Sequence, residues 1–251
     1  MEQSEEKNLT QTRVRRNLTK ALAIGGAAAL SQLAPRKAQA VVPCFLKGTQ
    51  ILTPDGYRAI ETLKNNDLVQ SKFGGAQPIK WIFQTSYKKS NPAKSWVNDV
   101  KPVRIAKSAI RENVPSSDLH VSPQHAIFID GTLFPAESLV NDVTIARDDE
   151  VARDEIEYFH ILLENHDVVV ANGLECETLR RMKENASNFA DYLRLHGDAE
   201  TLPLCAPRFE YAGGRAKIKS HLLSAISQIV DLRRDGDVIR DRLEERAFSS
   251  F

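Results

Sequence analysis

Short β-prone segments, each closed by a turn signal, limit the fold of this chain more than any other feature of its sequence. They recur between residues 44 and 178, where Gly, Pro, Asn and Asp interrupt runs of β-branched and aromatic residues. Strands this short bury their apolar side chains only when they pair into sheets that pack on each other. The pattern therefore predicts a mainly β domain, arranged as a sandwich or in a barrel-like form.

Several segments of this region have the composition and length of a strand. The pair Asp130-Gly131 predicts a two-residue hairpin turn. The runs at 158–163 and 167–170 are expected to pair with each other, and residues 106–112 are expected to form a short helix. The predicted strands are residues 49–53, 67–71, 79–84, 102–105, 119–122, 126–129, 158–163 and 167–170.

The composition changes after Thr178. Apolar residues then recur at helical spacing, in stripes over residues 179–193, 218–230 and 238–243. Such stripes are usually contacts with a core, so they indicate no cofactor site. We expect two or three helices, which make residues 179–251 a small α-helical C-terminal region.

The first 40 residues have the order of an export signal. Arg15-Arg16 and Lys20 precede a weakly apolar run, residues 21–30, that is too short to anchor the chain in a bilayer. Ala38-Gln39-Ala40 supplies the small residues of a cleavage site after Ala40. The paired arginines predict a twin-arginine (Tat) signal peptide and hence a periplasmic or extracellular protein. The alternative is an amphipathic N-terminal helix, and no later stretch is apolar enough to span a membrane.

Composition excludes several classes of protein. The chain has 251 residues, 42% hydrophobic and 27% charged, which favours a packed core over disorder. A net charge of +1 gives no sign of a nucleic-acid partner. Histidines and cysteines do not form the close pairs that zinc sites usually show, so no metal or cofactor is expected.

The three cysteines leave two arrangements open. If export places the protein in an oxidising compartment, Cys176 and Cys205 can form a disulfide, which leaves Cys44 as a free thiol. In the other arrangement none of the three is bridged.

Cys44 has the chemistry of an internal nucleophile. Its thiol can attack the carbonyl of the preceding residue, Pro43, which converts the amide into a thioester. The departing nitrogen then needs a proton, and the carbonyl oxygen needs a hydrogen-bond donor. Ser122-Pro123-Gln124-His125 offers a hydroxyl and an imidazole three residues apart, and these are the groups that such a step requires.

Three motifs together resemble the Hint domain family, which includes the hedgehog autoprocessing domains and the inteins. They are the opening block from Cys44 to Gly56, the Ser122-x-x-His125 turn, and the segment from Tyr158 to Ala171-Asn172-Gly173. The resemblance covers slightly more than half of the chain. It implies a Hint-type, all-β, horseshoe-like domain over residues 41–178, between the export signal (1–40) and the helical region (179–251).

The resemblance also implies roles for the candidate catalytic residues. Cys44 is the nucleophile, His125 the proton donor, and Ser122 the hydroxyl that assists it, in place of the commoner Thr. His160 stands where many relatives have Asp and is expected to activate water against the thioester. His166 is a further candidate, expected mainly to hold its loop together.

The chain departs from the family pattern at three points. No His-Asn pair follows Asn172-Gly173, although cyclisation of such an Asn is needed for splicing, so the resemblance implies self-cleavage without splicing. Cys176 is then expected to be a structural or disulfide-bonded residue. Pro43 restricts the attacked bond, which would slow an acyl shift. Asn66 replaces a Gly found in relatives, and Asn also tolerates a left-handed backbone.

The leading hypothesis is a single-turnover, autocatalytic protein whose substrate is its own polypeptide. An N–S acyl shift at Cys44 gives cleavage of the Pro43–Cys44 bond, and water or an unknown external nucleophile resolves the thioester. The alternative is a catalytically silent, exported Hint module with a structural or interaction role. A third hypothesis, a Cys–His hydrolase acting on other molecules, lacks a third catalytic member and a Gly-rich oxyanion loop.

Overall fold

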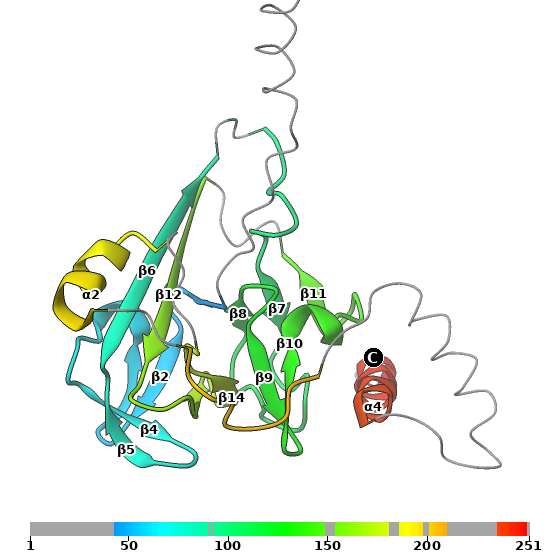
Figure 1. Cartoon of the computed structure of the whole chain (residues 1–251). Helices are drawn as coiled ribbons and strands as arrows, with labels where there is room; N and C mark the ends of the chain where they lie inside the picture. The colour runs from blue at the N-terminus through cyan, green and yellow to red at the C-terminus, as the bar shows by residue number, and fades with distance from the viewer. Residues whose placement is uncertain are drawn as a thin grey trace, which may run out of the picture. The chain divides into compact units, whose positions relative to one another are not determined.

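The computed structural model describes residues 43–89, 91, 93–148, 154–180, 186–197, 201–209 and 235–249. The chain divides into two compact units, Met1–Gln39 and Ala40–Phe251, and all described residues belong to the second. The predicted export signal therefore lies outside the described residues. Within the second unit, the described residues form two antiparallel sheets and two α-helices (Figure 1).

The first sheet has the chain's opening strand near its middle. In spatial order its strands are β11 (Ile145–Arg147), β7 (Val103–Ile105), β8 (Leu119–Val121), β1 (Phe45–Leu46), β12 (Glu155–Leu162) and β6 (Trp81–Lys88). All neighbours are antiparallel. β12 pairs with β6 along its whole length, which gives the long ribbon in Figure 1.

The second sheet has a main path of strands and a hairpin attached to it. The path runs β10 (Thr132–Pro135), β9 (Ala126–Ile129), β14 (Leu174–Glu177), β13 (Val168–Ala171), β2 (Gln50–Thr53) and β3 (Gly56–Ala59). The hairpin consists of β4 (Leu68–Ser71), which pairs with β13, and β5 (Gly75–Pro78). Two 3-10 helices, η1 (Ile60–Thr62) and η2 (Ala136–Leu139), follow β3 and β10.

Asp167 joins this hairpin to the rest of the sheet. Its buried carboxylate accepts hydrogen bonds from the Ser71 hydroxyl (2.9 Å), the Gln77 side chain (2.8 Å) and the backbone N–H groups of Phe73 (3.1 Å) and Gly74 (3.0 Å). A buried carboxylate is costly unless hydrogen bonds fill its lone pairs. Asp167 therefore stabilises the β4–β5 turn against β13.

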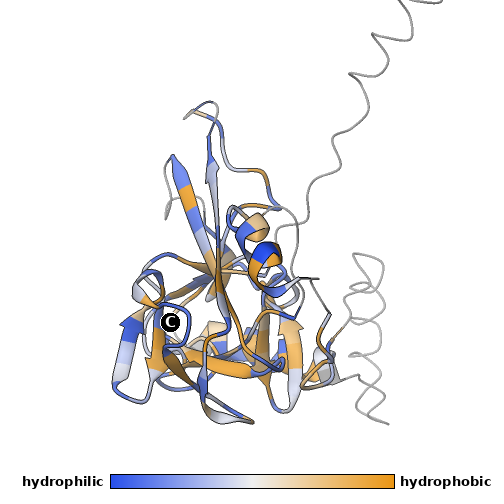
Figure 2. Ribbon diagram, turned by 60° about the vertical axis from the view of Figure 1, so that its left-hand side comes forward, coloured by the Kyte–Doolittle hydropathy of each residue, from blue (hydrophilic) through white to orange (hydrophobic). Residues whose placement is uncertain are grey.

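Apolar side chains pack on both faces of β12. Phe159 and Ile161 belong to the main core between the sheets, whereas Tyr158 and Leu162 belong to a second apolar group. This follows from the strand itself, since successive side chains point to opposite faces. Figure 2 shows hydrophobic residues along the inner strands. The aromatic members of the second group, called the aromatic cluster below, are Trp81, Phe83, Trp96, Tyr158 and Tyr192, and Cys44 belongs to the same group.

Helix α2 (Phe189–His196) covers the aromatic cluster. Tyr192 is buried, and its ring centroid lies 5.7 Å from that of Trp81 and 5.8 Å from that of Phe83. The predicted stripe over 179–193 is thus helical only from Phe189 among its described residues.

Helix α4 (Asp235–Ser249) buries Ile239 and Leu243 in the main core. Arg246 Nε donates to the Ser108 carbonyl at 2.7 Å, which fastens the helix to the β domain. The third predicted stripe is therefore confirmed as a helix, while the stripe over 218–230 lies outside the described residues.

The mainly β fold is confirmed, and each predicted strand overlaps a strand of the structure. The turn at Asp130-Gly131 joins β9 to β10, and Asn66 has φ 72°, in the left-handed region. Two predictions are wrong. Residues 158–163 and 167–170 do not pair, because β1 and β6 occupy both edges of β12. Residues 106–112 form turns instead of a helix, because the Ile110 N–H bonds forward to the Val114 carbonyl.

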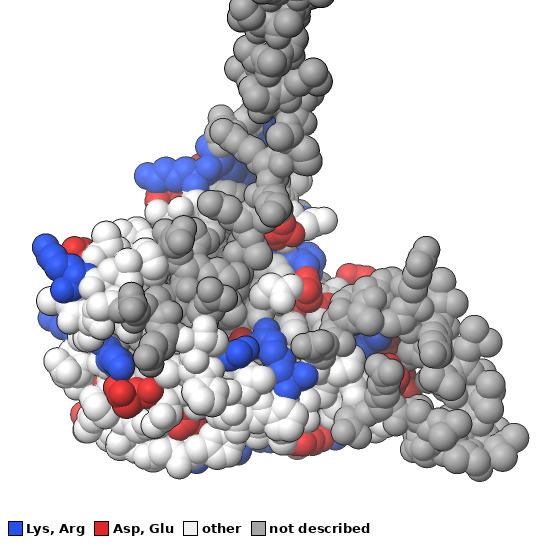
Figure 3. All heavy atoms as spheres, viewed as in Figure 1, with Lys and Arg blue, Asp and Glu red and all other residues white. Residues whose placement is uncertain are grey.

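The surface mixes charges of both signs. On the face drawn in Figure 3, basic and acidic side chains are interspersed among uncharged ones. Neither α2 nor α4, the helices that the described residues form, is long and apolar enough to cross a membrane.

Two hairpin turns have nearly the same backbone but different surroundings. Asp130-Gly131 has φ values of 47° and 87°, and Asn172-Gly173 has values of 45° and 80°. A Cβ atom on Gly131 would meet no atom within 4 Å, whereas one on Gly173 would lie 3.0–3.2 Å from Ser116. The second turn is therefore packed against the loop before β8, and the first is open.

We expect Gly173→Ala to lower the free energy of unfolding more than Gly131→Ala does. Both substitutions carry the same strain of a left-handed backbone, about 1–2 kcal/mol, but only Gly173→Ala also displaces Ser116. Urea unfolding of the two variants should differ by about 1–3 kcal/mol. Equal losses would mean that the Ser116 loop moves aside at no cost.

Candidate functional site

Cys44 and Ser122 face each other where β1 meets β8. The Cys44 N–H donates to Ser122 Oγ at 2.8 Å, and the Ser122 N–H donates to the Cys44 carbonyl at 2.8 Å. These bonds continue the pairing of the two strands, in which Phe45 stands opposite Val121. Both residues are buried. The Ser122 hydroxyl therefore contacts the nitrogen of the Pro43–Cys44 peptide bond directly.

His160 approaches from the other neighbour of β1. Phe45 pairs with Phe159, so the same antiparallel register carried on by one residue sets His160 opposite Cys44. The His160 ring centroid lies 5.8 Å from that of Phe45 and 4.9 Å from that of His125. The short strand β1 thus lies between the strands that lead to the two histidines.

His125 follows Ser122 through a tight turn. Its N–H donates to the Ser122 carbonyl at 3.0 Å, and its carbonyl accepts from the Ala136 N–H at 2.9 Å. Its ring packs on Phe45 with a centroid distance of 4.2 Å and is completely buried. The run from β8 through this turn to β9 therefore carries both a hydroxyl and an imidazole into the core.

Both imidazoles are unpaired within the part of the chain that the structure describes. The ring nitrogens of His125 and His160 are buried and have no hydrogen-bond partner there. Each unsatisfied buried polar group costs about 1–3 kcal/mol. Groups of this kind call for an explanation, such as a bound water molecule or a part in chemistry.

Burial keeps both imidazoles neutral. Loss of solvation, reinforced by the positive charge of Arg208, lowers the pKa of His125 to about 3. The backbone groups of Cys44 and Glu177 oppose this shift but are weaker. Burial also lowers the pKa of His160 well below its ordinary value, and the neighbouring His125 adds to the effect. Near neutral pH each ring therefore has one nitrogen that can donate a proton and one that can accept.

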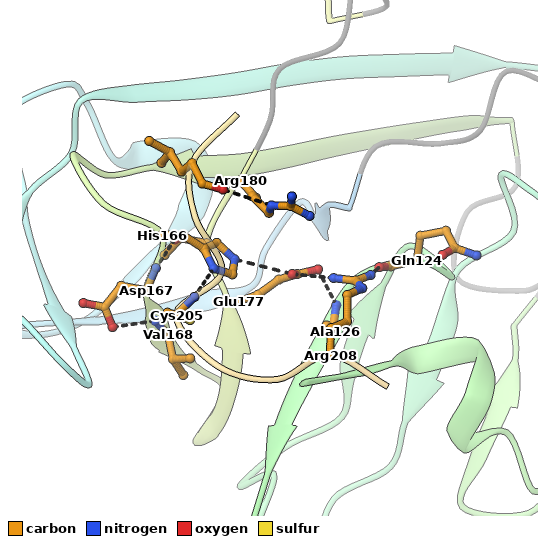
Figure 4. A network of polar contacts seen from close by, with 11 residues as sticks. Gln124, Ala126, His166, Asp167, Val168, Glu177, Arg180, Cys205 and Arg208 are labelled. Carbon is orange, nitrogen blue, oxygen red and sulfur yellow. Dashed lines mark hydrogen bonds and ion pairs between the residues drawn. The ribbon is translucent and has the colours of Figure 1, made fainter. Parts of the chain in front are cut away.

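His166 belongs to a different set of contacts, shown in Figure 4. Its Nδ1 accepts from the backbone N–H of Cys205 at 3.0 Å, and its Nε2 lies 3.5 Å from Glu177 Oε2. Burial opposes ionisation of Glu177, but the His166 side chain and the charge of Arg208 outweigh it and lower the pKa of this carboxyl. These contacts suit a residue that holds its loop together.

The Glu177 carboxylate also connects to the turn that carries His125. Its Oε2 lies 2.6 Å from Nη1 of Arg208, and its Oε1 accepts from the Ala126 N–H at 2.8 Å. Nη2 of Arg208 donates to the Gln124 carbonyl at 2.8 Å. The ion pair therefore contacts the residues immediately before and after His125, as Figure 4 shows.

The structure brings four of the candidate residues together around β1, namely Cys44, Ser122, His125 and His160. The fifth, His166, has its described hydrogen bond with Cys205 instead. No group of His, Cys, Asp and Glu among the described residues could hold a metal ion.

The three cysteines, all described residues, form no disulfide, so the arrangement with a Cys176–Cys205 bridge is not the one observed. Burial raises the pKa of Cys176 well above its ordinary value. Burial, together with the charge of Asp167, raises the pKa of Cys205 to about 11. Neither thiol is therefore activated as a nucleophile.

Two residues of this site, Glu177 and Arg208, are not marked by any pattern in the sequence. Glu175 and Glu177 alternate with apolar residues in β14 and look alike in the sequence. Only the fold separates them, since Glu175 pairs with Lys72 at the surface while Glu177 is 2% exposed. Arg208 lies in the loop between two predicted helices, where no local pattern marks it.

The Hint domain family matches this chain over residues 43–183. The chain belongs to the Hint domain family. The match contains every candidate residue and Glu177, and it ends before Arg208. A search of curated proteins finds no match.

Several solved inteins are similar to this Hint domain. The gp41-1 intein has 17% identity and a TM-score of 0.38, covering 54% of this chain and 98% of its own. The DnaB intein from Synechocystis sp. PCC 6803 has 10% identity and a TM-score of 0.37, with the same coverage of 54% and 98%. A bacterial intein-like domain from Clostridium thermocellum has 11% identity and a TM-score of 0.32, covering 54% and 97%.

The buried histidines should make this Hint domain less stable in mild acid. An unfolded histidine takes up a proton below about pH 6.5, but folded His125 does so only near pH 3 and His160 is depressed in the same direction. The free energy of unfolding should therefore fall as the pH drops below about 6.5, by up to about 1.4 kcal/mol per pH unit for each of the two residues.

Urea unfolding between about pH 6.5 and about pH 5, above the range in which carboxyls ordinarily titrate, measures this slope. His160→Phe should remove the part of this slope that His160 contributes, because no proton is then gained at that position on unfolding. Identical slopes for the wild type and His160→Phe would contradict a depressed pKa for His160.

Proposed function

We propose that this Hint domain cleaves its own chain at the Pro43–Cys44 bond through an N–S acyl shift. The observation that carries the proposal is the 2.8 Å hydrogen bond from the Cys44 N–H to Ser122 Oγ. It sets a hydroxyl, which can also donate a proton, on the nitrogen that must leave. Membership of the Hint family supports self-processing in general.

In the first step the Cys44 sulfur attacks the carbonyl carbon of Pro43. The new C–S bond forms as the C–N bond breaks, and the proton lost by the thiol ends on the Cys44 nitrogen. His125 is suited to carry this proton, because its neutral ring has a nitrogen free to accept it. Since burial destabilises the imidazolium, the ring returns the proton readily.

In the second step a nucleophile breaks the thioester. Water adds to the Pro43 carbonyl carbon, the C–S bond breaks, and the thiol regains its proton. His160 is the residue proposed to hold and activate this water, because the register sets it opposite Cys44 and its ring nitrogens are unpaired within the described structure. An external nucleophile in place of water breaks the same C–S bond and remains attached to the Pro43 carbonyl carbon of the upstream fragment.

Burial of the site favours one alternative, a catalytically silent Hint module that serves as a structural or interaction domain. Cys44 is 2% exposed, and Ser122, His125 and His160 are 0% exposed. The Cys44 side chain also lies beside the aromatic cluster. Cleavage by this domain therefore needs water to enter a closed site.

We further propose that residues 1–40 direct export by the twin-arginine route. Arg15-Arg16, the apolar run over 21–30 and Ala38-Gln39-Ala40 support this proposal. Removal of the signal after Ala40 leaves Val41-Val42-Pro43 as the segment released by self-cleavage. Self-cleavage of the unprocessed chain instead removes residues 1–43.

Blocking export and comparing the wild type with Cys44→Ala tests the self-cleavage. We expect purified wild-type protein to begin at Cys44 and Cys44→Ala to remain uncut, because alanine cannot form the thioester. Intact mass and N-terminal sequencing give the result, and hydroxylamine or dithiothreitol should increase cleavage in the wild type only. Uncut chains in both proteins, even with hydroxylamine, would support the silent module.

The hydroxyl of Ser122 can be tested separately. Ser122→Ala removes the contact with the scissile nitrogen and should slow cleavage by about hundredfold or more, whereas Ser122→Thr keeps the hydroxyl and should slow it far less. The rate of fragment formation, followed by mass spectrometry, gives both values. Similar losses in the two variants would point to packing rather than to the hydroxyl.

A further inference from the structure

We propose that Glu177 and Arg208 are positioning residues for His125, which hold its turn from both sides and set the charge around its ring. This inference rests on the proposed role of His125 in self-cleavage. It also extends the site beyond the residues of the family match, because Arg208 lies after residue 183.

The turn that carries His125 is fastened on both sides of that residue. Arg208 Nη2 donates to the Gln124 carbonyl at 2.8 Å, and the Ala126 N–H donates to Glu177 Oε1 at 2.8 Å. Between them, Arg208 Nη1 and Glu177 Oε2 are 2.6 Å apart. Neither peptide flanking His125 can rotate without breaking a hydrogen bond to a charged group, and such bonds are stronger than neutral ones.

The ion pair is largely withdrawn from water. The Glu177 side chain is 2% exposed and that of Arg208 is 23% exposed. A buried ion pair gives little net stability compared with apolar residues of the same size, because both charges lose their hydration. Stability alone is therefore a weak reason for this pair, whereas control of a catalytic turn uses both its geometry and its charge.

Arg208 is itself held against the hairpin that follows the turn. The Leu133 N–H donates to the Pro207 carbonyl, and the Phe209 N–H donates to the Leu133 carbonyl, each at 2.8 Å. The Phe209 ring centroid lies 5.3 Å from that of Phe134. These contacts bind residues 207–209 to β10, the partner of the strand β9 that begins at the end of the turn. The region after the family match thus completes the surroundings of His125.

The charges that face His125 come from several elements. Arg208, from the segment after the match, opposes protonation of the ring, and the backbone groups of Cys44 and Glu177 favour it. His160, from β12, is itself neutral near neutral pH. Removing the charge of Arg208 should therefore raise the pKa of His125, while removing that of Glu177 should mainly loosen the turn. The two residues have separable effects.

The test uses the full chain and four variants, Arg208→Gln, Arg208→Lys, Glu177→Gln and Lys72→Gln. Lys72→Gln is the matched control, because Lys72 pairs at 2.7 Å with Glu175 on the same strand as Glu177, but at the surface. Cleavage rates are measured by intact mass from about pH 8 to about pH 5, a range that brackets the ordinary titration of histidine.

We expect Arg208→Gln and Glu177→Gln to slow cleavage about tenfold to hundredfold, because a small displacement of a catalytic group has effects of that size. Only Arg208→Gln should also raise the pKa of His125, because it removes the positive charge that opposes protonation of the ring. Arg208→Lys keeps the charge but not the two-pronged contact, so it should cleave slowly with a wild-type pH profile. Lys72→Gln should stay within about twofold of the wild type, as surface ion pairs contribute little.

A second measurement distinguishes failure of this positioning role from failure of the proposed self-cleavage. NMR titration of the histidine rings in a Cys44→Ala background, where cleavage is blocked, gives the pKa of His125 with and without Arg208→Gln. A raised pKa in Arg208→Gln upholds the effect on His125 even if the wild type never cleaves. An unchanged pKa, or cleavage by Arg208→Gln at the rate and pH profile of Lys72→Gln, would overturn it.

Arg208→Gln leaves Glu177 buried without its cation, which can prevent folding. The double variant Glu177→Gln/Arg208→Gln removes both charges and retains amide groups that can hydrogen-bond to each other. It should fold, show the raised pKa of His125 and cleave slowly. A folded double variant in which the pKa of His125 is that of the wild type would overturn the proposal, as an unchanged pKa in Arg208→Gln would.

Discussion

The two-residue strand β1 is the element on which the site depends. It lies between β8 and β12, and backbone hydrogen bonds hold it on both edges. Because Cys44 directly precedes β1, its peptide bond emerges where β8 leads to Ser122 and where β12 carries His160. Residues 78 positions apart in the chain thus come within hydrogen-bond distance through an ordinary antiparallel register. The closeness of thiol, hydroxyl and imidazole is a consequence of strand pairing.

Burial then decides what these groups can do. Two neutral imidazoles, unpaired in the described structure, lie beside Phe45 in a closed core. This arrangement weakens the fold and makes each ring a ready carrier of one proton. Glu177 and Arg208, which contact the turn of His125, form an ion pair with each other. A site of this kind suits a reaction within the chain, because the substrate is already in place.

The sequence predicted the parts of the fold that follow local patterns. Alternating strands, the Asp130-Gly131 turn and the left-handed Asn66 all depend on a few neighbouring residues. The sequence-based prediction was wrong where the pairing of a strand depends on residues that are distant in the sequence. The runs at 158–163 and 167–170 are close in sequence, yet β12 and β13 lie in different sheets. Residues 106–112 have helical composition, but they form turns, in which the Ile110 N–H donates to the Val114 carbonyl.

For the candidate site, the sequence by itself selected Cys44, Ser122, His125 and His160, because short motifs with fixed spacing carry them. The tertiary structure decided the neutral state of the histidines, the place of His166 beside Cys205, and the joining of Glu177 to Arg208. The physical reason is that hydration and charge depend on neighbours brought together by sheet pairing. Glu175 and Glu177 have the same local pattern, and only packing makes one a surface partner of Lys72 and the other a buried one of Arg208.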